Sequence, residues 1–229
     1  MSASPEDLME NTEAKGFVSE RGPFVINANP AVKQPHTREE VDAQFDKAAE
    51  AFDHEALSAE FGSEEARQKV AEMVRALTPG TSTTMLLFQG GANGMSLSHN
   101  WFGPNFPLFR HSHPRFGDCL YYVVGGELLM GNRKLGRGST FFIPNGQPYK
   151  FTAGADGVEV LEFRAGGGEE DASGTIVKEK SLDAIQQIIE RSYEVDTEWQ
   201  VPERMGDLIL RESGTDTESG DPSELPKTD

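Results

Sequence analysis

The feature that most constrains the fold is a series of short β-rich runs between residues 81 and 165. The runs read TTMLLF, MSLSHNWF, LFRHSH, CLYYVV, ELLMG, STFFIP, YKFTA and VEVLEF. Glycine, asparagine and proline separate them, and the segments GGANG, MGNRK and GADG are predicted to form turns. Many short strands in close succession are typical of an antiparallel sandwich or barrel. We therefore expect one β-barrel over residues 81–165.

Helical patterns precede this β-rich segment, in residues 37–80. Thr37 and Glu40 have the spacing of a capping box, in which each side chain satisfies the other's free backbone N–H at the start of a helix. A second helix is predicted to begin near Ser63 and to end at the sequence TPG. The barrel is thus expected to follow a helical segment.

The chain ends are predicted to be less regular. Residues 1–36 contain several prolines and form an irregular arm, whereas residues 166–210 contain a linker and a docking helix with Ser181 as its N-cap. Residues 211–229 are almost free of apolar side chains and are expected to be a disordered acidic tail. The predicted fold class is mainly β with flanking α-helices.

Charge and hydrophobicity exclude several classes of partner. The chain has 229 residues and a formal net charge of −17, which argues against nucleic acid and against an anionic membrane surface. No apolar run approaches the roughly 18 residues of a membrane span, and the acidic N-terminus does not resemble a secretory signal. The single cysteine, Cys119, cannot form an internal disulfide and is interpreted as a small buried hydrophobe. We expect a cytoplasmic location.

The stretch FRHSHPRFGDCLYY contains the strongest candidate site. His111 and His113 project from the same face of a strand because side chains alternate there. Asp118 opens the next strand, and an antiparallel return brings its carboxylate towards the two imidazoles. Two histidines and a carboxylate form the facial triad of non-haem iron(II) sites. The alternative is that Asp118 only caps the turn.

The wider spacing resembles the two motifs of the cupin superfamily, G-x5-H-x-H-x3-4-E-x6-G and G-x5-P-x-G-x2-H-x3-N. The first is matched by His111, His113, Asp118 in place of Glu, and Gly125, with Gly103 as the leading glycine two residues early. The second is matched by Gly138, Pro144 and Gly146. Tyr149 stands in place of the third metal histidine, and Ala153 replaces the asparagine.

The resemblance implies a double-stranded β-helix, or jelly-roll barrel, that binds a divalent metal ion. Iron(II) is favoured, with zinc, manganese or nickel as alternatives, and the ligands are His111, His113, Asp118 and Tyr149. For Tyr149 the roles of ligand, outer hydrogen-bond donor, general base and simple aromatic filler all remain open. Family members often dimerise, so the resemblance also allows for a homodimer.

Further residues are expected around the site. His99 lies in the preceding run and is a candidate acid/base group if its face points inward, the alternative being a hydrogen-bonded core histidine. The cavity is predicted to be lined by residues that share the parity of Asp118, together with aromatic and aliphatic walls: Leu120, Tyr122, Val124, Phe141, Ile143 and Phe151.

The leading prediction of function is an iron(II) dioxygenase that acts on a small organic substrate. One alternative is a lyase or isomerase with Tyr149 as base, similar to the dimethylsulfoniopropionate lyases among the cupins. The other is a non-catalytic cupin that binds a small ligand.

Overall fold

A computed structural model describes residues 17–18, 25–26, 31–48, 63–89, 94–114, 116–165, 175–200 and 209–211. Most of the predicted N-terminal arm, of the GGANG turn and of the acidic tail lies outside these residues, so those interpretations stay predictions.

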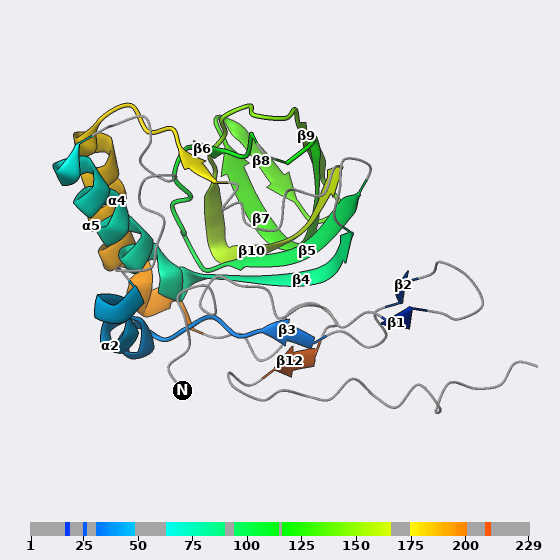
Figure 1. The fold of residues 1–229 in the computed structure, drawn as a ribbon, viewed down its shortest axis with the longest axis horizontal. Helices are drawn as coiled ribbons and strands as arrows, with labels where there is room; N and C mark the ends of the chain where they lie inside the picture. The colour runs from blue at the N-terminus through cyan, green and yellow to red at the C-terminus, as the bar shows by residue number, and fades with distance from the viewer. Residues whose placement is uncertain are drawn as a thin grey trace, which may run out of the picture.

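One antiparallel sheet of six strands forms most of the barrel (Figure 1). Its members are β4 (Thr81–Gln89), β5 (Met95–Phe102), β7 (Cys119–Met130), β8 (Arg133–Gly136), β9 (Thr140–Ile143) and β10 (Thr152–Ala165). The spatial order is β4-β5-β10-β7-β8, and β9 also pairs with β7. β10, the last strand of this sheet in sequence, therefore lies between β5 and β7, a crossover winding of the jelly-roll kind.

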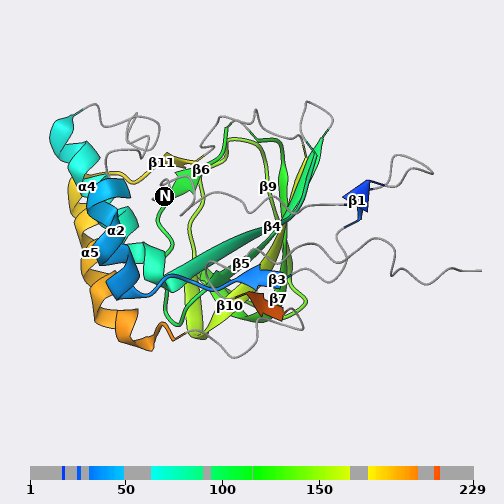
Figure 2. The same ribbon diagram turned by 60° about the horizontal axis from the view of Figure 1, so that its bottom comes forward.

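A second wall lies across the barrel from this sheet (Figures 1 and 2). Here β6 (His111–Ser112) pairs with β11 (Ile176–Val177). The backbone before and within β6 also bonds to the segment that leads into β10, because His111 and Tyr149 exchange N–H···O bonds of 3.1 and 2.9 Å. This exchange places His111 and Tyr149 side by side and confirms the expected mainly β barrel.

Glycine pairs let β7 and β10 run longer than predicted. CLYYVV and ELLMG belong to the single strand β7, and GADG lies inside β10 as a bulge, so the turn prediction for GADG is wrong. A Cβ on Gly126 would lie 2.1 Å from the carbonyl oxygen of Gly157, and both residues have positive φ. The MGNRK turn is confirmed, since Met130 pairs with Arg133 at the β7–β8 hairpin.

The flanking helices begin where the sequence predicts. They are α2 (Arg38–Ala48), α4 (Glu64–Leu77) and α5 (Leu182–Val195), and α4 and α5 lie side by side in both views (Figures 1 and 2). The capping box forms, with Thr37 N donating to Glu40 Oε2 and Glu40 N to Thr37 Oγ1. The hydroxyls of Ser63 and Ser181 accept the backbone N–H bonds of Ala66 and Ala184, respectively.

The helical layer meets the barrel through two short 3-10 helices, η1 (Thr78–Gly80) and η2 (Asp196–Glu198). Trp199 follows η2, and its indole N–H donates to Pro104 O at 2.9 Å. A Cβ on Gly80 or Gly103 would lie 2.5 Å from the indole ring, so both positions must stay without a side chain. The contact between the helical layer and the barrel is therefore closely packed.

Four short strands complete the described residues. They are β1 (Phe17–Val18), β2 (Val25–Ile26), β3 (Ala31–Lys33) and β12 (Ile209–Arg211). β3 is anchored to β4 because Lys33 N donates to Thr84 Oγ1 at 2.7 Å. Among the described helices, none is long and apolar enough to cross a bilayer.

Candidate metal and substrate site

The inward face of β7 carries Cys119, Tyr121 and Val123, all of them at most 3% exposed. Leu120 and Tyr122 are 43% and 41% exposed and face outward. The prediction that Leu120, Tyr122 and Val124 line the cavity is therefore wrong by one residue. Both faces of this strand are apolar in sequence, so hydrophobicity does not indicate which face is buried.

Asp118 has the outward parity and is exposed. Its Oδ1 accepts a hydrogen bond of 2.9 Å from the backbone N–H of Asn145, as expected of a residue that stabilises a turn. Cys119 takes the inward position next to it. The structure does not bring Asp118 to the two histidines, and the predicted facial triad is not assembled.

His111 and His113 do converge. Their rings meet edge to face with centroids 4.8 Å apart. His111 Nδ1 lies 2.9 Å from the carbonyl oxygen of Phe109, so Nδ1 carries the proton and Nε2 keeps its lone pair. His113 Nδ1 lies 3.2 Å from Thr175 Oγ1. Histidines that bind metal through one nitrogen are typically held in this way through the other.

Tyr149 faces the two imidazoles. Its ring centroid lies 4.4 Å from that of His111, and its hydroxyl is 3.4 Å from His113 Nε2. The same hydroxyl shares a short hydrogen bond with the hydroxyl of Tyr121. Burial, followed by the nearby charge of Glu162, raises the pKa of both phenols, so without a metal they are neutral.

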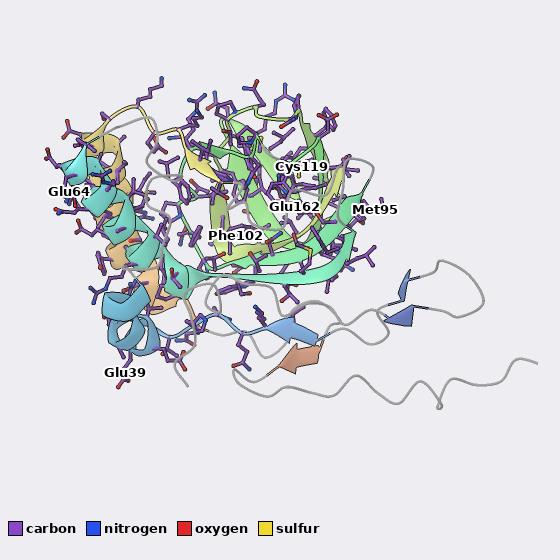
Figure 3. All side chains as sticks on the ribbon, viewed as in Figure 1. Glu39, Glu64, Met95, Phe102, Cys119 and Glu162 are labelled. Atoms are coloured by element: carbon purple, nitrogen blue, oxygen red, sulfur yellow. The ribbon has the colours of Figure 1, made fainter. Side chains whose placement is uncertain are left out.

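An ion pair that sequence reasoning missed lies beside these groups. Arg164 Nη2 pairs with Glu162 Oε1, and Asn100 Nδ2 donates to Glu162 Oε2 at 3.2 Å. Glu162 and Cys119 lie within the ring of strands in Figure 3. The signal was present, because the two charged residues continue the inward alternation of Val158 and Val160.

Burial controls the protonation of the remaining groups. It lowers the pKa of His111 to about 4, so this imidazole is neutral near pH 7. Burial also raises the pKa of the Cys119 thiol to about 12. For Arg164, burial is the largest influence and lowers the pKa, but the neighbouring acidic groups, Glu162 first among them, together outweigh burial and raise the pKa. The Glu162–Arg164 pair is thus the main charge in this part of the interior.

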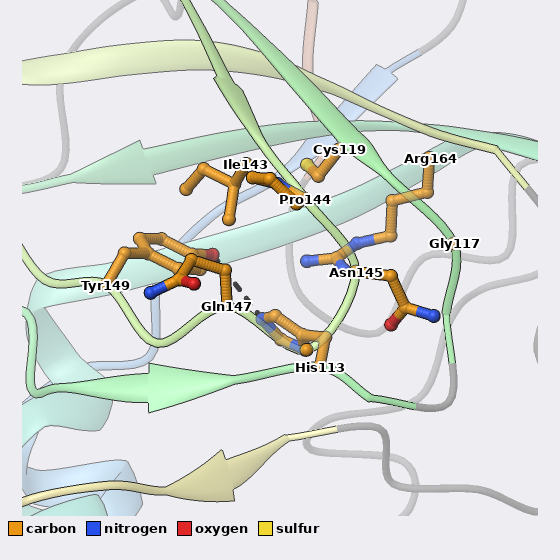
Figure 4. A pocket seen from close by; sticks show the side chains of 10 residues that line it. His113, Gly117, Cys119, Ile143, Pro144, Asn145, Gln147, Tyr149 and Arg164 are labelled. Atoms are coloured by element: carbon orange, nitrogen blue, oxygen red, sulfur yellow. Dashed lines mark hydrogen bonds between the residues drawn. The ribbon is translucent and has the colours of Figure 1, made fainter.

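These residues border a recess that is partly open to solvent (Figure 4). The space that it encloses is about 10 Å³, room for roughly one water molecule. Its polar walls include His113, Cys119, Tyr149 and Arg164, and the predicted wall residue Ile143 contributes apolar surface. The recess is small beside ordinary ligand pockets of roughly 300–1,000 Å³.

His99 lies on the other face of β5, away from the recess. Its Nε2 is 3.0 Å from Glu159 Oε2, and the side chain is only 2% exposed. The neighbouring residues Ser98 and Asn100 point towards Glu162 instead. The structure therefore supports the alternative of a buried, hydrogen-bonded histidine and does not bring His99 to the predicted catalytic site.

The donor set fits a divalent cation in part. Within the described residues, no group of three or more histidine, cysteine, aspartate or glutamate side chains is arranged to hold a metal ion. Two imidazoles with oriented Nδ1 atoms are present, and the third donor nearest to them is the phenol oxygen of Tyr149. A bound cation lowers the pKa of a neighbouring acidic group, which favours a phenolate ligand.

No protein-family model matches the sequence, and no curated protein matches it. Solved structures that are similar include KdgF from Halomonas sp. (20% identity, TM-score 0.35, 41% of this chain and 83% of that one). An RmlC-like cupin from Shewanella frigidimarina is 21% identical, with a TM-score of 0.34 over 41% of this chain and 80% of that one. The DMSP lyase DddQ from Ruegeria pomeroyi is 20% identical, with a TM-score of 0.36 over 43% and 51%. These similarities are to cupin-like barrels and carry no information on activity.

Proposed function

We propose that the barrel interior binds a divalent metal ion through His111, His113 and Tyr149, and that the protein is a lyase or isomerase for a small organic molecule. The observation that carries the proposal is the pair of imidazoles whose Nδ1 atoms have outer partners and which face a phenol hydroxyl. That combination provides metal ligands and a proton acceptor in one place.

The position of Asp118 favours proton transfer over oxygen chemistry. The iron(II) dioxygenase prediction rested on a facial triad of two histidines and a carboxylate. Asp118 instead stabilises a turn on the outside of the barrel. Iron(II) therefore loses its preference, and zinc, nickel and manganese are equally good candidates for two nitrogen donors and one oxygen donor.

Tyr149 is the proton acceptor of the proposed reaction. A bound metal would supply Lewis-acid polarisation of a substrate oxygen. With the cation bound, Tyr149 would be a phenolate, and its oxygen would take the proton from the adjacent substrate carbon and become a phenol. Tyr121 donates its hydroxyl hydrogen to the Tyr149 oxygen and so stabilises negative charge there.

The test is proton exchange without oxygen. Metal-loaded protein is incubated anaerobically in D₂O with a panel of small ketones and carboxylic acids, and deuterium incorporation or elimination is followed by NMR. We expect turnover of at least one compound, and a loss of about 100-fold or more in Tyr149→Phe, as for removal of a general base. Tyr122→Phe, on the outward face of β7, is the matched control and should keep full activity.

Two results would contradict the proposal: turnover only in the presence of oxygen, or full activity in Tyr149→Phe. Protein that binds members of the panel but exchanges no proton would support the non-catalytic, ligand-binding alternative instead.

A further inference from the structure

The outer face of the barrel carries a row of apolar residues, one from each of five neighbouring strands. In the order in which the strands pair, they are Leu87 (β4), Leu97 (β5), Phe163 (β10), Leu120 (β7) and Phe142 (β9), and each is the register partner of the next. Because neighbouring strands lie about 4.8 Å apart, this outer apolar row is roughly 19 Å long.

Much of the outer apolar row is in contact with solvent. Phe163, Leu120 and Phe142 are 38%, 43% and 59% exposed. Met95, which shares the face of Leu97, is 50% exposed and lies at the end of the sheet away from the helical layer (Figure 3). The solvent face of an antiparallel sheet is ordinarily polar, and a contiguous exposed apolar patch marks a contact surface.

The area of this patch is sufficient for a weak protein–protein contact. A large side chain has a surface of roughly 200 Å², so the exposed parts of Met95 and of the three exposed row members amount to about 400 Å² per chain. Two copies would bury about 800 Å² from these residues alone, before their surroundings are counted, whereas weak specific pairs bury up to about 1,200 Å².

The distribution of charge favours a second copy of this chain as the occupant. The row itself has no ionisable side chain. Residues 81–165 contain seven Lys and Arg against five Asp and Glu, although the whole chain has a net charge of −17. The excess of acid therefore lies outside the barrel, and two barrels that meet through this face bring together surfaces of nearly balanced charge.

We infer that two copies of the chain pair through the outer apolar row, with their sheets face to face about a two-fold axis. Each copy then offers the same patch, and the pair is closed because neither patch is left over. Phe163 and Leu120, in the middle of the row, lie near the axis in this arrangement. The inference depends neither on a bound metal nor on the proposed function.

The test is sedimentation velocity of the full chain over a range of about 1 to 200 µM. We expect the mass to rise with concentration from 25.1 kDa towards twice that value, with a dissociation constant of roughly 10–100 µM for a contact of this size. At about 1 µM the chain is then mostly monomeric, so replacement of Phe142 hardly changes the stability measured there.

Variants locate the contact. Leu120→Glu places a charge from each copy near the axis and should weaken pairing by at least about tenfold, and Phe142→Glu, at the end of the row, should weaken it as well. Leu129→Glu is the matched control, because Leu129 lies on the same strand as Leu120, is likewise 43% exposed and is not in the row. It should leave pairing unchanged. Circular dichroism verifies that each variant is folded.

A chain that stays monomeric up to the highest concentration would overturn the inference without any variant, and would indicate that another protein or another segment of this chain covers the row. Pairing that survives both Leu120→Glu and Phe142→Glu, or that Leu129→Glu weakens equally, would also overturn it, because the copies would then meet elsewhere. Assemblies larger than two chains would contradict the closed two-fold arrangement.

Discussion

Replacement of Phe106 by alanine is expected to lower the free energy of unfolding by about 3–5 kcal/mol. Phe106 is 1% exposed and packs between Phe102 and Trp199, with ring centroids 5.3 and 5.4 Å away. Gly80 and Gly103 already lie against the same indole, so the surrounding backbone has little room to collapse into the cavity. Urea denaturation, followed by circular dichroism, measures the loss.

The matched control is Phe142→Ala, at a position that is 59% exposed on β9. It should change the stability by about 0.5 kcal/mol or less, as for an ordinary surface substitution. A loss in Phe106→Ala as small as that in Phe142→Ala would contradict the close packing of Phe106 between Phe102 and Trp199.

Arg164→Gln is expected to destabilise the protein by about 3–5 kcal/mol, because it removes one partner of a buried ion pair. Glu162 and Arg164 have side-chain exposures of 11% and 9%, and in the variant Asn100 still donates a hydrogen bond to the carboxylate. The double variant Glu162→Gln/Arg164→Gln removes both charges and should recover most of the loss. Denaturation of the three proteins at neutral pH and equal salt provides the comparison.

A double variant as unstable as Arg164→Gln would contradict this account of the pair. The loss would then come from packing around the guanidinium and not from an uncompensated carboxylate.

The helix starts and strands could be predicted from sequence because they depend on local chemistry. The hydroxyls of Ser63 and Ser181 cap helices through backbone N–H groups three residues away, and a capping box needs only two residues at that spacing. The run MSLSHNWF is the strand β5 without change of bounds. Such interactions involve residues that are only a few positions apart in the sequence.

Tertiary structure decides which face of β7 is buried and therefore which of its residues point inward. Asp118 and Cys119 are neighbours in sequence, so their side chains point to opposite faces of the sheet. When the inward set of residues shifts by one position, Cys119 faces the interior in place of Asp118. The GADG segment has turn composition, yet it bends a strand because it lies opposite Gly126 on β7. These outcomes depend on which strands pair, and that information is distributed over the whole barrel.

The sequence indicated the two histidines and the tyrosine of the candidate site but not its ion pair. The backbones of His111 and Tyr149 pair, and the Tyr149 hydroxyl faces His113, so the residues that the cupin motifs singled out do lie together. Glu162 and Arg164 were not singled out from the sequence, because charged residues are seldom fully buried. Only their alternation with Val158 and Val160 marked them as inward.

The most direct test of the central claim is the metal content of the protein after dialysis against zinc and then against metal-free buffer. The account predicts about one zinc ion per chain in the unaltered protein and in Asp118→Asn, and close to none in His111→Ala/His113→Ala. Retention of zinc by the double histidine variant, or its loss in Asp118→Asn alone, would contradict the site described.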